Sequence, residues 1–210
     1  MATYKEKVGT AVVNYAGNYP GAVDGELWYD STNKDFKYQY ANVTSAGSWR
    51  TANNLNTARR HLAGAGASNT VSLAFGGGPP VQAVTESYDG TNWTEVNDLG
   101  TGRYNTASSN GSSTSALLFG GRTPPGGPTG AIKTLTESWN GTNWTEVNDL
   151  NLARYGMGGS GADNTAALGF GGYATPPNGV SALTEVWNGT NWTEQGNLST
   201  AREYVGGAGT

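Results

Sequence analysis

Charged residues that recur at fixed spacing are the first candidates for chemistry in this sequence. The repeated acids and bases are Glu86, Glu137 and Glu185, and Arg59, Arg103, Arg154 and Arg202. Glycoside hydrolysis would need such groups gathered around one pocket together with a nucleophile. Each of these residues instead takes one position in one copy of a repeat, so we interpret them as structural. Because a charge in a thin interior must be paired, the sequence predicts ion pairs or backbone hydrogen bonds between neighbouring strands.

The single histidine does not provide the basis of a metal site. A metal centre needs several nitrogen, thiolate or carboxylate ligands at suitable spacing, and His61 follows two arginines in a chain without cysteine. The lack of cysteine also excludes disulfides and thiolate chemistry. We expect no metal ion, no cofactor and no catalytic residue, and hence no enzymatic activity.

The composition favours short strands joined by tight turns. Of 210 residues 33 are glycine, 36% are hydrophobic and only 13% are charged, and glycine, asparagine and threonine disfavour helices. The net charge is -4 without a basic cluster, which argues against binding to nucleic acid. No apolar stretch is long enough to cross a bilayer or to act as a secretory signal. We expect synthesis in a cytoplasm and no insertion into membranes.

Four copies of one pattern must position the repeated charges. Each copy has a tryptophan, a leucine six residues later and one of the arginines four residues after that. The anchoring tryptophans are Trp49, Trp93, Trp144 and Trp192. They are 44, 51 and 48 residues apart, which is in the range of propeller blades. The pattern divides the chain into an N-terminal segment, 1–48, and a repeat region, 49–210, whose units start near the four tryptophans.

Each unit contains four strand candidates, which predicts an all-β fold of four-stranded antiparallel sheets. A glycine-rich strand follows the arginine, and a short apolar run that ends in Phe-Gly-Gly comes next. Two further strands are joined by Asp89-Gly90, Asn140-Gly141 or Asn188-Gly189, which is the strongest short-range hairpin signal. The aromatic residues that flank these turns should pair on one face of each sheet. The expected pairs are Tyr88 with Trp93, Trp139 with Trp144, and Trp187 with Trp192.

All variation in repeat length falls in one loop per unit. The loops span 78–84, 122–135 and 173–183, between the Phe-Gly-Gly strand and the next Thr-Glu pair. Each contains two adjacent prolines, namely Pro79 and Pro80, Pro124 and Pro125, and Pro176 and Pro177. Binding residues are often found on exposed loops of a rigid frame, and the low charge of these loops favours a carbohydrate or a protein surface as ligand. The alternative is that they are plain spacers.

The units resemble the kelch repeat, in which a hydrophobic strand ends in Gly-Gly and is followed by Tyr-Asp, a short turn, a tryptophan and a downstream arginine. The glycine pairs of this pattern are Gly76 and Gly77, Gly120 and Gly121, and Gly171 and Gly172. Two copies depart from it, since Trp-Asn stands at 139–140 and at 187–188 where the pattern has Tyr-Asp. The resemblance covers residues 49–210 and implies a β-propeller with about four blades.

The sequence of the repeats is also similar to kelch-like structural proteins of tailed phages. Upstream, residues 20–49 resemble the Leu-Trp-Tyr-Asp hairpin segments of phage fibre proteins. These resemblances imply a non-enzymatic virion protein, made in the host cytoplasm without a signal peptide, that forms an exposed fibre, appendage or decoration. The implied partners are other virion proteins, further copies of the chain, and a glycan or protein of the host surface.

The sequence leaves open how the sheets would close into a ring. The chain has three Phe-Gly-Gly strands but four arginine-headed segments. We expect an incomplete propeller, or one completed by oligomerisation, rather than a closed ring of four blades. The N-terminal segment, in which we expect a β-hairpin, would serve for attachment or would complete the last blade. A carbohydrate-binding module of a bacterial envelope and a propeller glycosidase are the competing functions.

Overall fold

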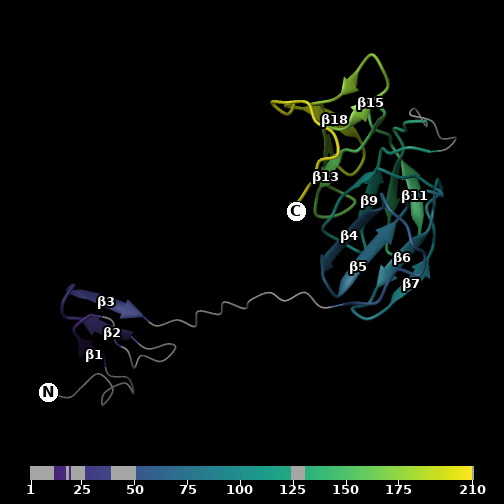
Figure 1. Cartoon of the computed structure of the whole chain (residues 1–210). Coiled ribbons are helices and arrows are strands. Elements are labelled where there is room, and N and C mark those ends of the chain that lie inside the picture. The colour runs from purple at the N-terminus through teal and green to yellow at the C-terminus, as the bar shows by residue number, and fades with distance from the viewer. Residues whose placement is uncertain (1–11, 18, 20–26, 39–50, 124–130, 210) are drawn as a thin grey trace. The chain divides into compact units, whose positions relative to one another are not determined.

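The computed structural model describes residues 12–17, 19, 27–38, 51–123 and 131–209 (Figure 1). The chain divides into two compact units, residues 1–50 and 51–210. The described residues form strands, turns and loops, without a helix among them. The all-β class expected from the composition is therefore confirmed.

The N-terminal unit contains a three-stranded sheet of its own. Its order is β1 (Val13–Tyr15), β2 (Leu27–Asp30) and β3 (Asp35–Tyr38), with β1 parallel to β2 and β2 antiparallel to β3. The expected hairpin is present as β2–β3, and a parallel strand is added to it. Asp30 fixes the turn of this hairpin, because its carboxylate accepts hydrogen bonds from the backbone N–H groups of Thr32 and Asn33.

The repeat region contains three four-stranded antiparallel sheets, which we call blades 1, 2 and 3. Blade 1 has the order β4 (Ala63–Ser68), β5 (Val71–Phe75), β6 (Thr85–Tyr88) and β7 (Trp93–Val96). Blade 2 is formed by β8 (Ala107–Ser108), β9 (Ala116–Phe119), β10 (Thr136–Trp139) and β11 (Trp144–Val147). Blade 3 is formed by β13 (Gly158–Ser160), β14 (Ala167–Phe170), β17 (Thr184–Trp187) and β18 (Trp192–Gln195). The predicted blade-like sheets are confirmed, while the described strands do not form a closed ring.

Each anchoring tryptophan of the described residues lies on the last strand of a blade. Trp93, Trp144 and Trp192 begin β7, β11 and β18, and the connection that follows leads to the first strand of the next blade. The fourth unit therefore supplies the outer strand of blade 3 and then residues 202–209, which contain no regular strand. Trp49 lies outside the described residues.

A smaller sheet forms where the third variable loop leaves blade 3. Its order is β12 (Arg154–Tyr155), β15 (Tyr173–Ala174) and β16 (Gly179–Val180). The same pairing recurs as single bridges in the other units, between Arg60 and Gly78 and between Tyr104 and Arg122. Each variable loop thus begins as an extension of the frame.

The Gly-Gly pairs end the second strand of every blade because the backbone there has positive φ. Gly120 and Gly121 have φ of 67° and 97°, a region that residues with a side chain rarely adopt. A Cβ on Gly120 would come within 2.6 Å of the Arg154 carbonyl oxygen, to which the Gly121 N–H donates a 2.8 Å hydrogen bond. The next connection therefore passes directly over the glycines. The same conformation is found at Gly76, Gly77, Gly171 and Gly172.

The predicted aromatic pairs are present at the outer hairpins. The ring centroids are 5.0 Å apart for Tyr88 and Trp93, 5.3 Å for Trp139 and Trp144, and 5.5 Å for Trp187 and Trp192. The two members of each pair are directly opposite in the strand register. Each pair thus lies at the base of the hairpin turn that joins the two strands.

The hydrophobic core lies between the blades. One apolar cluster joins blades 1 and 2, and a second joins blades 2 and 3. In each cluster the phenylalanine of Phe-Gly-Gly is fully buried and meets the tryptophan of the following blade edge-on. The ring centroids are 4.9 Å apart for Phe75 and Trp144 and 4.7 Å for Phe119 and Trp192. Successive sheets therefore share a buried apolar interface.

Candidate functional site

The repeated acids and bases form three buried ion pairs, as the sequence predicts. Each pair joins an arginine of a connection to a glutamate of the blade that follows it. The distances are 2.8 Å for Arg59 and Glu86, 2.7 Å for Arg103 and Glu137, and 2.6 Å for Arg154 and Glu185. The side chains of all six residues are at most 3% exposed. The pairs are therefore part of the interior of the frame.

The bonds around Arg103 show why these charges are not available to a ligand. Its Nη1 donates to the carbonyl oxygens of Gly120 at 3.1 Å and Leu135 at 2.6 Å, and its Nη2 donates to Glu137. The second carboxylate oxygen of Glu137 accepts from the Gly100 N–H at 2.7 Å. Burial lowers the pKa of Arg103, and the Glu137 charge opposes that shift. The guanidinium holds three separate parts of the blade together.

Arg202 does not share this environment. It occupies the same repeat position, but it is exposed, and its Nε donates a long 3.4 Å hydrogen bond to the carbonyl oxygen of Thr200. Its role as a structural residue equivalent to Arg103 is therefore not realised within the described residues. The difference is physical, since the described residues after Arg202 form no blade with a glutamate opposite it.

His61 has a conformational role rather than a place in a ligand cluster. It has a φ of 56°, and the equivalent positions Asn105, Gly156 and Tyr204 have positive φ as well. Its carbonyl oxygen accepts from the Asn105 N–H at 3.0 Å, and the same bond repeats from Gly156 to Asn105 and from Tyr204 to Gly156. These bonds link the inner ends of successive units. Within the described ranges no three residues among His, Asp and Glu gather to hold a metal ion.

Aromatic residues and one arginine fix the base of the variable loops. The guanidinium of Arg122 lies 4.4 Å above the ring of Tyr155 and 5.8 Å from that of Tyr104. Tyr155 also contacts Tyr173, with centroids 5.5 Å apart, and Tyr204. Burial raises the pKa of Tyr155, Tyr204 adds to that shift and Arg122 opposes it. This cluster was not predicted, although Tyr104 and Tyr155 directly follow repeated arginines, Tyr204 stands two residues after Arg202, and Arg122 and Tyr173 directly follow Gly-Gly pairs.

The prolines of the loops lie at exposed positions where they are described. Pro79, Pro80, Pro176 and Pro177 are exposed, and Pro124 and Pro125 lie outside the described residues. The first and third loops thus present their prolines to solvent, while the bases of the loops are tied to the blades. This arrangement suits a binding surface on a rigid support.

A polar hollow of about 480 Å³ lies under the third variable loop. Its lining combines amide groups with a carboxylate and a short apolar patch. The lining includes Asn151, Asn178, Val180, Ser181, Glu194 and Asn197. Asn151 is held in place by hydrogen bonds from its Nδ2 to Glu185 and to the Trp192 carbonyl oxygen. The hollow thus brings hydrogen-bonding groups of a variable loop together beside Asn151, whose position is fixed.

Comparison with known proteins adds no assignment: no family model matches this chain, and no curated protein matches it in sequence. The described residues include no helix with the length and apolarity that a membrane span requires. Function is therefore inferred from the geometry of the frame and of its loops.

Proposed function

We propose that this chain is a non-enzymatic structural protein of a virion, part of an exposed fibre, appendage or decoration, whose variable loops bind a host surface. One observation carries the proposal. The buried ionisable groups of the repeats, such as Arg103 and Glu137, bond to one another and to the backbone, so the repeated residues build a support and only the loops vary. Other virion proteins and further copies of the chain are the partners that this role requires.

The ligand that we infer for the loops is an uncharged carbohydrate or a polar protein surface. Amide groups of Asn178 and Asn197 and the carboxylate of Glu194 border the hollow, and such groups can donate to and accept from sugar hydroxyls. Val180 is 42% exposed beside them and offers an apolar contact.

A glycan array probed with the full chain tests this binding role. Binding to a defined set of glycans is expected, and both Asn178→Ala and Glu194→Gln should weaken it at least tenfold. Asn69→Ala is the matched control, because Asn69 is an exposed asparagine on the turn before β5, away from the hollow. If Asn69→Ala weakened binding as much as the two loop variants, or if the full chain bound no glycan on the array, the proposed glycan-binding loop would be contradicted.

A carbohydrate-binding module of a bacterial envelope is the second candidate function, since the same polar hollow would serve it. The two functions differ in where the protein is found. Mass spectrometry of purified phage particles should detect this chain at a fixed ratio to other virion proteins if the first proposal holds. Recovery of the chain from bacterial envelopes in the absence of phage would favour the second.

A further inference from the structure

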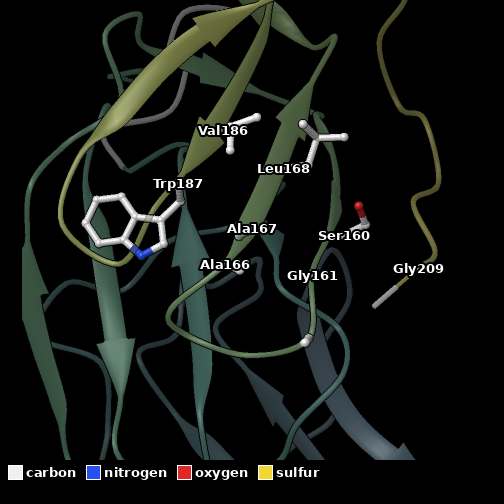
Figure 2. Close-up of a pocket in the computed structure, with 9 residues that line it drawn as sticks. Ser160, Gly161, Ala166, Ala167, Leu168, Val186, Trp187 and Gly209 are labelled. Atoms are coloured by element: carbon white, nitrogen blue, oxygen red, sulfur yellow. The ribbon is translucent and has the colours of Figure 1, made fainter.

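Within the described part of the repeat region, the outward face of blade 3 is open where the same face of blades 1 and 2 is closed. Phe75 and Phe119 are fully buried under the tryptophan of the next blade, whereas the equivalent Phe170 is partly exposed. Leu168 is partly exposed as well. Figure 2 shows Leu168 and Val186 on neighbouring strands beside a hollow of about 290 Å³, with Gly209 of the C-terminal segment across from them.

The open face keeps the polar groups that join the closed faces. Thr85 Oγ1 accepts a 3.0 Å hydrogen bond from Trp144 Nε1, and Thr136 Oγ1 accepts one of 3.0 Å from Trp192 Nε1. Thr184 stands at the equivalent position of blade 3 and is buried. Arg202 stands where the other arginines meet a glutamate of the following blade. A hydroxyl acceptor and a guanidinium therefore flank the apolar surface.

The C-terminal segment follows the path of a first strand. Its Tyr204 N–H donates to the Gly156 carbonyl oxygen at 2.7 Å, and the Arg202 carbonyl oxygen accepts from the Gly172 N–H at 2.8 Å. Both bonds repeat those that place the first strands of blades 2 and 3. In blade 2 the corresponding strand β8 pairs with β9 through Ala107 and Ser108. Residues 202–209 are thus in position to receive a second strand on their outer edge.

We propose that the open face binds a three-stranded antiparallel sheet of the same repeat type, with a tryptophan and a glutamate at the repeat positions. The first strand of this partner pairs with residues 205–208, as in other cases of strand addition to a sheet edge. Its tryptophan covers Phe170 and donates to Thr184 Oγ1, and its glutamate forms the ion pair with Arg202. The partner completes a fourth blade, a role distinct from the binding of ligands by the loops.

Two features of the face define what the partner is. A complete blade with its own first strand, such as blade 1 of a second copy, would need the place that residues 202–209 already occupy. The amides of Asn97 and Asn148 donate to the hairpin turn of the next blade, whereas Gly196 stands at that position in the fourth unit. The partner is therefore held by the apolar face, the arginine and the threonine, without the amide contact.

Binding of a peptide with the sequence of residues 68–101 to the full chain tests the proposal. This peptide carries the three outer strands of blade 1, including Glu86 and Trp93. Labelled peptide should bind saturably. Arg202→Ala in the chain and Glu86→Gln in the peptide each remove a charge and should weaken binding at least tenfold. Thr184→Val in the chain should also weaken binding. Arg60→Ala, which removes another exposed arginine, should leave it unchanged. Binding no tighter than that of a scrambled peptide overturns the proposal.

Fusion of the same sequence behind Thr210 keeps the proposal testable if the free peptide aggregates. The fusion places a glutamate 27 residues after Arg202, the separation of Arg59 and Glu86. The fusion should have a higher Tm than the parent chain, and Arg202→Ala should lower the Tm of the fusion but not that of the parent. A fusion with the Tm of the parent would contradict binding of the added sheet to the open face. Self-association of the chain that Arg202→Ala abolishes would identify a second copy instead and overturn the assignment.

Discussion

Arg103 and Arg202 occupy the same position of the repeat in two very different surroundings. Arg103 is fully buried and bonded to Glu137 and to two backbone carbonyl oxygens, whereas Arg202 is exposed beside Thr200. The residues are chemically identical, so the difference comes from the sheet that packs after each of them. A position in this repeat acquires its role only when the following blade is in place.

The apolar residues show the same contrast. Leu117 is fully buried between blades 2 and 3, and its equivalent Leu168 lines the hollow on the open face of blade 3. Each closed face combines an ion pair, a phenylalanine–tryptophan contact and a threonine–tryptophan hydrogen bond. Stability in such an array depends on the contacts between nearest neighbours. Matched substitutions at closed and open faces can therefore measure what one blade contributes to the next.

The largest effect is expected from breaking a buried ion pair. Arg103→Ala leaves the Glu137 carboxylate without its partner in the interior, and removal of one member of a buried pair costs about 3–5 kcal/mol. The free energy of unfolding, measured by urea denaturation, should fall by that amount. Arg202→Ala is the control, and it should change the value by less than about 0.5 kcal/mol. Similar losses in the two variants would contradict the contrast between the two arginines.

A smaller effect is expected from the apolar faces. Leu117→Ala opens a cavity between blades 2 and 3, and such truncations cost about 2–5 kcal/mol. Leu168→Ala removes a side chain that is already in contact with solvent, so its loss should be well under half as large. Calorimetric melting of both variants checks the difference. A loss at Leu168 equal to that at Leu117 would mean that the face of blade 3 is closed in solution.

The hydrogen bond between blades should contribute less again. Thr136→Val keeps the shape of the side chain but removes the acceptor of Trp192 Nε1, and loss of one such bond costs about 1 kcal/mol. Thr184→Val changes the equivalent residue of blade 3, for which no tryptophan is placed opposite, and should be nearly neutral. Chemical denaturation of the two variants side by side gives the comparison. A larger loss of unfolding free energy in Thr184→Val than in Thr136→Val would contradict the role of this hydrogen bond.

The sequence predicts the parts of the frame that depend on spacing and local turn chemistry. Asn140-Gly141 indicates a hairpin by itself, and the hairpin determines that Trp139 and Trp144 face one another. The pairing of Arg103 with Glu137 could be expected because both residue types recur at fixed positions. These hairpins, aromatic pairs and ion pairs recur for the same physical reason in every unit. Each copy therefore supports the structure predicted for the other copies.

The contacts between blades and the loop clusters could not be derived in the same way. The partner of Trp192 is Thr136, which is 56 residues away, and nothing in the spacing indicates which face of a sheet the next one covers. The contact of Arg122 with Tyr155 occurs between one pair of units. Because it is not repeated, comparison of the repeats does not reveal it. The asparagines of the polar hollow come from a loop, a connection and the end of a strand. Only the three-dimensional packing brings them together.

A change remote from the blade faces should have the smallest effect, and Asp89→Asn provides it. Asp89 accepts hydrogen bonds from the N–H groups of Asn92 and Thr91, which lower its pKa, and Asn140 makes the same two bonds in blade 2. Because the pKa in the folded state lies below the ordinary value of about 3.9, the charged form contributes stability above that pH and loses it as the pH falls through the folded value. The parent should therefore melt slightly above the variant near neutral pH, and it should lose this small advantage as the pH falls below about 4. A melting difference that stays constant from pH 7 to pH 3 would show that the Asp89 charge does not stabilise the turn.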